Sequence, residues 1–204
     1  MDITIMPKGF SEREKTLIRA QLLAKGRELF ATQGIKKANV EDLTKAANIS
    51  KGAFYLFFDS KEELFFELLG LFEDEYHDKL VEAAARPGAS PRQQVKDVLI
   101  QAFTIWRTNP LFTHFNQEEY EYLARKLPEE LIQSNLNKDA IFVDQLLGQW
   151  RDQGVVIDCE PALFLGLTRA LFYMSLHEQE VGSGVYPDVI NFFIDAIAQQ
   201  IVRE

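Results

Sequence analysis

Positions 36–61 combine positive charge, small side chains and helix caps in a way that suits the binding of phosphate groups. Lys36 and Lys37 precede a short predicted helix, and a second short helix begins after Ser50 with Lys51 and Gly52. Ser50 can cap this second helix, so the N-terminus of the helix is basic and uncrowded. Its backbone N–H groups can therefore approach a phosphate. The segment is a candidate anion-binding surface.

Two short helices position these residues. The spacing of apolar residues predicts helices over 40–47 and 51–57, with Asn39 as the cap of the first. The chain must turn sharply at Asn48, and asparagine tolerates a positive φ better than other non-glycine residues. This plan is a helix-turn-helix, whose second helix enters the major groove of DNA. From geometry alone, an ordinary helical hairpin packed in a core remains an alternative.

The sequence offers little support for catalysis or metal binding. His77, His114 and His177 lie far apart, and no pair of them has metal-ligand spacing. Cys159 has no histidine nearby, and the chain lacks the nucleophile elbow, the P-loop and the dinucleotide fingerprint. We therefore expect no catalytic residues, no metal and no cofactor. A helical enzyme stays open as an alternative, because catalytic groups can assemble from distant positions.

Composition bounds the class of protein. The chain has 204 residues, 47% of them hydrophobic and 26% charged, which is typical of a folded globular protein. The net charge of −9 is uneven, with +4 over residues 1–61 and −13 over the remainder. A single cysteine excludes an intrachain disulfide. Neither a signal peptide nor an apolar run of 18 residues is present, so we expect a cytoplasmic protein without a membrane segment.

Helical periodicity runs from end to end, which predicts an all-α fold. Ser11 and Glu14 form a capping-box pattern at the start of the first helix, and Gly34 follows its end. We expect a helix-turn-helix domain over residues 1–60 and a larger helical bundle over residues 61–204. The predicted helices span residues 11–33, 40–47, 51–57, 61–85, 91–108, 110–116, 118–126, 128–153, 161–179 and 187–203.

The run from Arg27 to Leu69 resembles the N-terminal domain of TetR-family transcriptional regulators. The string SKGxxYxxFxSKEEL, behind a first short helix at this spacing, carries most of the resemblance, which covers about residues 11–70. The matching positions are Leu29, Phe30, Gly34, Val40, Leu43, Ala46, Ala47, Ile49, Ser50, Lys51, Gly52, Tyr55, Phe58, Ser60, Lys61, Glu62 and Leu64. The resemblance implies a three-helix DNA-binding domain, a ligand-binding body and a homodimer.

The resemblance also implies roles for individual residues. The Tyr55 hydroxyl and the Lys61 ammonium would contact phosphates, and the start of the recognition helix would meet base edges or backbone. The predicted DNA-binding residues are Lys36, Lys37, Asn39, Val40, Ser50, Lys51, Gly52, Ala53, Tyr55 and Lys61. Leu56 and Phe57 depart from the pattern, because these positions often carry histidine or tyrosine. This departure favours an alternative, in which the protein has lost DNA binding.

Two helices near the C-terminus carry more apolar surface than one protomer needs. Residues 162–176 are apolar on nearly every side, and the last helix has two apolar stripes. Two such helices from each of two chains would form a four-helix interface with twofold symmetry. A single thick core is the alternative. The predicted interface residues are Leu167, Leu171, Ile190, Phe193, Ile194 and Ile197.

Aromatic side chains concentrate between the connecting helix and these two helices. Such residues are most often core, but helical bundles also bind small ligands in their interiors. Arg169, inside an apolar helix, needs either a protein carboxylate or an acidic ligand as its partner if it is buried. The predicted ligand-binding residues are Phe103, Trp106, Arg107, Phe112, Phe115, Phe142, Leu146, Trp150 and Arg169.

These observations together predict a ligand-responsive transcriptional regulator. The predicted partners are double-stranded DNA with a palindromic operator, a small-molecule effector and a second copy of the chain. We expect a repressor that a small, largely apolar molecule releases from its operator. The alternative is an all-α small-molecule-binding or interaction protein without DNA binding.

Overall fold

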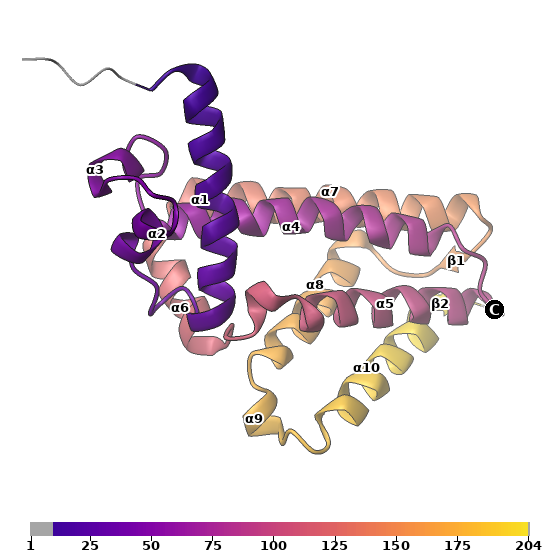
Figure 1. The fold of residues 1–204 in the computed structure, drawn as a ribbon. Coiled ribbons are helices and arrows are strands. Elements are labelled where there is room, and N and C mark those ends of the chain that lie inside the picture. The colour runs from indigo at the N-terminus through magenta and orange to yellow at the C-terminus, as the bar shows by residue number, and fades with distance from the viewer. Residues whose placement is uncertain (1–9, 204) are drawn as a thin grey trace, which may run out of the picture.

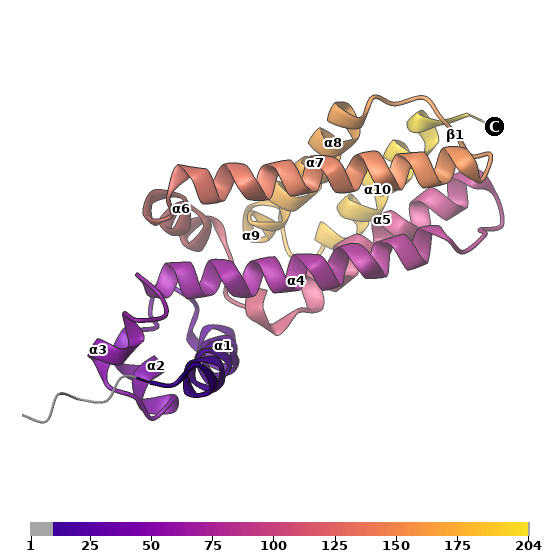
Figure 2. The same cartoon turned by 90° about the horizontal axis from the view of Figure 1, so that it is seen from above.

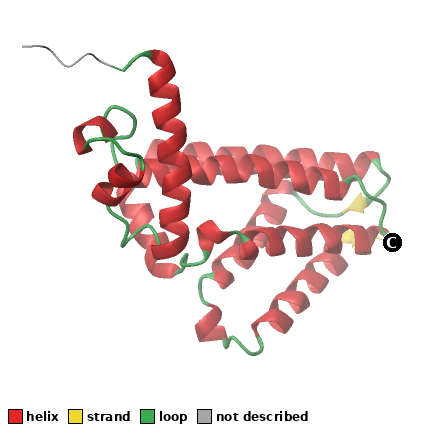
Figure 3. Ribbon diagram, in the orientation of Figure 1, coloured by secondary structure: helices red, strands yellow, loops and turns green. Residues whose placement is uncertain are grey.

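The structure, a computed structural model, describes residues 10–203 and is built almost entirely of helices (Figures 1 and 3). The all-α fold expected from the sequence is therefore confirmed. The elements in chain order are α1 (Glu12–Gln33), α2 (Val40–Ala46), α3 (Lys51–Phe54), α4 (Lys61–Ala84), α5 (Pro91–Thr108), the 3₁₀ helix η1 (Pro110–Phe112), α6 (Gln117–Lys126), α7 (Glu129–Asp152), β1 (Val156–Ile157), α8 (Pro161–Ser175), α9 (Glu178–Val181), α10 (Tyr186–Ile201) and β2 (Val202–Arg203).

The head is formed by α1, α2 and α3 together with the first half of α4. Its core contains Leu22, Phe30, Leu43 and Phe54, which are fully buried. Helix α1 crosses α4 closely at Gly26, where an added Cβ would lie 2.4 Å from a side-chain carbon of Leu64. A larger residue at Gly26 would therefore push the two helices apart.

The body is formed by the second half of α4 with α5, α7, α8 and α10. In both views α4 and α7 run along each other, and α10 packs against α5 (Figures 1 and 2). The core of the body includes Val98, Leu147, Trp150, Phe164 and Ile194, each almost completely buried. Within residues 10–203, no helix has both the length and the apolar character needed to cross a bilayer.

Helix α4 belongs to both halves of the molecule. The buried cluster of the head continues along α4 as far as Phe72, and it includes Leu111 and Phe112 of η1 and Leu123 of α6. The cluster of the body begins on the same helix at Leu80. The head and the body therefore share one rigid element, and the division at residues 60 and 61 stays a prediction.

Most expected helices begin and end close to their predicted residues, but the C-terminal part differs. The helix expected over 161–179 ends at Ser175, and α9 follows it as a separate turn of helix. The helix expected over 51–57 ends at Phe54 and continues as turns. Strands β1 and β2 pair antiparallel with only two residues each, which is too short to leave a pattern in the sequence.

Candidate DNA-binding surface and its connection to the body

The turn between α2 and α3 has the local chemistry that the sequence predicted. The Asn39 side chain accepts a hydrogen bond from the Asp42 N–H (2.9 Å) at the start of α2, and the Ser50 hydroxyl accepts one from the Ala53 N–H (3.1 Å) at the start of α3. Asn48 has a φ of 53°, the only positive φ of a non-glycine residue in the described part of the chain. The caps and the turn hold α3 at a fixed angle to α2.

Helix α3 and the turn after it present one outward face. Lys51, Gly52, Tyr55 and Leu56 are exposed, whereas Ala53, Phe54 and Phe58 are buried in the head. These spacings place the exposed residues on one side of the helix and the buried residues on the other. We define the α3 face as Lys51, Gly52, Tyr55 and Leu56.

Ala53, one of the residues expected to meet DNA, has a buried side chain. Its side chain is 8% exposed and packs between α3 and the rest of the head, on the side opposite the α3 face. The first residues of α3 point to different sides of the helix, so not all of them can face DNA. The resemblance predicted a DNA contact for each of them. The small Ala53 side chain serves close packing instead.

An acidic residue of α2 accompanies the basic start of α3. The Lys51 ammonium donates a hydrogen bond to the Glu41 carboxylate, and both side chains are exposed. This contact lowers the pKa of Glu41 and raises the pKa of Lys51. Lys37 is also exposed, and no carboxylate of residues 10–203 pairs with it. Glu41 therefore lowers the net positive charge that the α3 face presents to phosphate.

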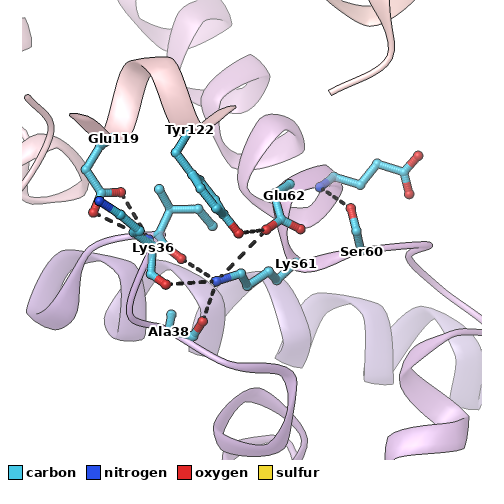
Figure 4. A network of polar contacts seen from close by, with 9 residues as sticks. Lys36, Ala38, Ser60, Lys61, Glu62, Glu119 and Tyr122 are labelled. Carbon is cyan, nitrogen blue, oxygen red and sulfur yellow. Dashed lines mark hydrogen bonds and ion pairs between the residues drawn. The ribbon is translucent and has the colours of Figure 1, made fainter. Parts of the chain in front are cut away.

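The Lys61 ammonium points into the loop between α1 and α2 (Figure 4). Its Nζ donates hydrogen bonds to the carbonyl oxygens of Ile35 (2.7 Å), Lys36 (3.2 Å) and Ala38 (2.6 Å). Burial lowers the pKa of Lys61, and the side chain is only 15% exposed. The three N–H donors of the ammonium are used by the loop between α1 and α2. In this structure the Lys61 ammonium thus holds the loop between α1 and α2 to α4, and its expected phosphate contact stays a prediction.

Helix α6 binds the same loop. The Lys36 N–H donates to Glu119 Oε2 (3.1 Å), and the Lys36 ammonium donates to Glu118 Oε2 (2.7 Å). The Tyr122 hydroxyl donates to the buried Glu62 carboxylate at the start of α4 (Figure 4). Burial and the Glu62 hydrogen bond raise the pKa of Tyr122. We call Lys36, Lys61, Glu62, Glu119 and Tyr122 the junction network.

Sequence reasoning missed most of this network. No sequence motif marks Glu118, Glu119 or Tyr122 as contacts of the head. A weak signal existed, because the Asn116 side chain accepts a hydrogen bond from the Glu119 N–H and caps the start of α6. Nothing in that pattern shows that the Glu119 carboxylate also reaches Lys36, 83 positions away.

The predicted ligand-binding residues divide between two places. Trp106, Phe112 and Phe115 pack with the cluster of the head, whereas Phe103, Phe142, Leu146 and Trp150 belong to the cluster of the body. The set therefore does not line one common pocket. The physical reason is that α5 and α7 are long rods, so their aromatic residues lie at different heights along the body.

The aromatic residues nearest the head form a tight group. Trp106 stacks on Phe112 at 3.7 Å between ring centroids, and Phe72 meets Phe112 edge to face at 4.9 Å. Phe172 of α8 packs edge to face on Trp106 at 4.9 Å, and Phe115 lies 5.8 Å from Phe112. We call these five residues the junction cluster. It joins α4, α5, η1 and α8 beside the junction network.

The two arginines expected near a ligand have protein partners. Arg107 pairs with Glu178 at 3.2 Å, and Arg169 pairs with Asp139 at 3.6 Å. Burial raises the pKa of Asp139, and Arg169 opposes this shift. Burial, with the nearby Asp139 charge, raises the pKa of Glu73 to about 7. Asp139 is thus a protein carboxylate that pairs with Arg169.

Four of the predicted interface residues lie in the core of the protomer. Leu171, Ile190, Ile194 and Ile197 are buried, while Leu167 is half-buried and Phe193 is exposed. The buried residues face α5 and α7, since α8 and α10 also close the core of the body. These four side chains therefore pack in the core of the protomer, and their part in a dimer contact stays a prediction.

A different apolar face is exposed on the same two helices. Leu163 (57% exposed) and Tyr173 project from α8, and Phe192 (70% exposed) and Phe193 project from α10. Ala170 is also exposed on α8. We call these residues the α8–α10 face.

Comparisons with known proteins agree with this architecture. Residues 22–68 match the sequence model of the family described as "Bacterial regulatory proteins, tetR family". The HTH-type transcriptional regulator YuxN of Bacillus subtilis is 28% identical over 134 residues, which cover 62% of this chain and 44% of YuxN. YhgD of the same organism is 26% identical over 152 residues, which cover 74% of this chain and 76% of YhgD. This chain thus spans less than half the length of YuxN.

A solved structure shares the fold over nearly the whole chain. SmeT, the repressor of the Stenotrophomonas maltophilia multidrug efflux pump SmeDEF, superimposes with a TM-score of 0.59 over 91% of each chain. The two sequences are 16% identical, so this similarity describes the fold alone.

A helix-turn-helix head here shares its last helix, α4, with a larger helical body. The sequence match covers the head, and residues 22–68 form a DNA-binding domain of the kind found in bacterial regulatory proteins of the TetR family. The resemblance seen over residues 11–70 is therefore confirmed. In residues 10–203, no group of histidine, cysteine or acidic side chains has the arrangement of a metal site.

Proposed function

We propose that this protein is a ligand-responsive repressor that binds a palindromic operator as a homodimer. The observation that carries the proposal is the α3 face, where Lys51 and Tyr55 are exposed beside Gly52. Gly52 leaves room for the backbone to approach DNA, since a Cβ there would meet no atom closer than 4.0 Å. The repressor SmeT, which has the same fold, supports the direction of regulation.

The α8–α10 face supports the homodimer. Large apolar side chains on two neighbouring helices form a surface that a second copy would cover, and a twofold axis would pair each face with itself. Such a dimer would present two α3 faces to successive major grooves, which are about 34 Å apart.

Sedimentation velocity of three proteins tests the dimer. We expect wild type to sediment as a dimer at micromolar concentration and Phe193→Glu to sediment as a monomer, because a buried unpaired charge costs several kcal/mol. Asn191→Glu is the matched control, since Asn191 is exposed on α10 away from the α8–α10 face. A wild-type monomer would remove the basis for a palindromic operator.

The junction cluster supports the proposed route of regulation. Trp106 and Phe112 touch Phe72 of α4, and the junction network ties the same helix and α6 to the head. A flat, largely apolar molecule that separates the Trp106 and Phe112 rings would displace α4 or η1. The two heads would then lose the spacing that DNA requires. An effector that favours the displaced state by about 1–3 kcal/mol would weaken DNA binding by about 5- to 150-fold.

Tryptophan fluorescence tests this route. The chain has two tryptophans, so Trp106→Phe identifies the signal of the junction cluster. We expect an effector found by screening to quench Trp106, and to bind more weakly when the operator is present, by the same factor as it weakens DNA binding. A compound that binds equally with and without operator is not an inducer acting by this route.

A gel shift separates the proposed function from its alternative. Leu56 on the α3 face favours a protein that has lost DNA binding, because a leucine cannot donate a hydrogen bond to phosphate or base. We expect selected duplex DNA to shift with wild type, and the affinity to fall steeply with salt. Failure to select any duplex at low salt would establish the alternative.

A further inference from the structure

Leu56 lies on the α3 face, and its side chain is not part of the buried cluster of the head. Its side chain is 71% exposed, and its position is fixed by a hydrogen bond from the Leu56 N–H to the Ala53 carbonyl (3.1 Å). The next residue, Phe57, is half-buried and turns back toward Phe10, at 6.2 Å between ring centroids. Leu56 is therefore the one large aliphatic side chain of the α3 face.

The chemistry of leucine limits what Leu56 can contact in a DNA groove. Leucine has no hydrogen-bonding atom, so beside a phosphate it would displace water from the oxygens without replacing the lost hydrogen bonds. Lys51 and Tyr55 already provide donors for phosphate on the same face. In the major groove, the C5-methyl group of thymine is the apolar group that base edges offer.

We propose that Leu56 is a specificity-determining residue that selects a thymine in each half of the operator by contact with its C5-methyl group. The inference rests on the DNA-binding function proposed above and adds a sequence preference to it. Leu56 lies one residue beyond Tyr55 and four beyond Gly52, on the exposed face where no Cβ at position 52 keeps the backbone from DNA. Leu56, which stands where histidine or tyrosine is usual, would thus recognise a thymine in the operator.

Deoxyuridine substitution tests the proposal, because deoxyuridine lacks only the methyl group of thymidine. A duplex selected from a random library with wild-type protein is remade with each thymine replaced in turn. We expect wild type to lose about fourfold in affinity at one position of each half-site, and about 15-fold when both are replaced, from the burial of one methyl group each. Leu56→Ala should bind the thymine and deoxyuridine duplexes equally, as in a double-mutant cycle.

Leu17→Ala is the matched control, because Leu17 is also an exposed leucine but lies on α1. We expect this variant to discriminate thymine from deoxyuridine as wild type does. Equal binding of both duplexes by wild type at every position would overturn the inference, as would discrimination that survives in Leu56→Ala. If wild type selects no duplex at all, the DNA-binding function fails, and the inference fails with it.

Discussion

Lys61→Met removes the ammonium group that ties the loop between α1 and α2 to α4, and it keeps a long side chain. The carbonyls of Ile35 and Ala38, both partly buried, would lose their donor, as would the more exposed carbonyl of Lys36. A buried carbonyl left unpaired costs about 1–3 kcal/mol, and methionine avoids the cost of burying a charge. We expect the free energy of unfolding in urea to fall by about 2–3 kcal/mol.

The salt dependence of DNA binding shows whether Lys61 also contacts phosphate. Each phosphate contact contributes about 0.9 to the slope of log affinity against log salt, so loss of one contact per protomer would lower a dimer's slope by about 1.8. Because the Lys61 ammonium is engaged inside the protein, we expect Lys61→Met to keep the wild-type slope. Fluorescence anisotropy with labelled duplex, between 50 and 200 mM salt, measures it.

Lys37→Met is the matched control for this experiment. Lys37 is exposed on the same loop, so we expect the opposite pattern, with wild-type stability and a slope lower by about 1.8. If Lys61→Met instead unfolds like wild type and shows the lower slope, the internal tie is not the role of Lys61, and the direct phosphate contact is correct.

Three further substitutions have defined outcomes. Glu41→Gln frees Lys51 and removes a negative charge beside the α3 face, so gel shifts should show tighter DNA binding at low salt and little change at high salt. Glu73→Gln keeps an acceptor for Asn135. Since the pKa of Glu73 is raised to about 7, the folded wild type holds a proton that the unfolded chain releases, and its stability falls as pH rises from 4.5 through 7. Urea unfolding should show the variant about 1–3 kcal/mol more stable at pH 8 and no more stable near pH 4.5; a constant difference would contradict this. Tyr186→Phe removes a buried hydroxyl that has no hydrogen-bond partner, so thermal unfolding should show a gain of about 1 kcal/mol, whereas a loss would reveal a hidden partner.

The sequence by itself determined the features that depend on neighbours in the chain. The caps at Ser11, Asn39 and Ser50, the turn at Asn48 and the limits of α5 follow from side chains that act within a few positions. Helical periodicity then predicted the all-α class, because one apolar face must be buried whatever covers it. The head could also be recognised, since its helix-turn-helix is a compact local motif.

Only the tertiary structure decided which groups meet across the chain. Lys61 reaches a carbonyl 26 positions away, Tyr122 reaches Glu62 across 60 positions, and Lys36 reaches Glu118 across 82. A charged residue reads the same in sequence whether it faces DNA, solvent or a carbonyl, because the partner and the burial that fix its role come from the packing of distant helices. The same reason explains α8 and α10: they are apolar on most sides, and only their packing on α5 and α7 shows that Ile194 is core while Phe192 is exposed.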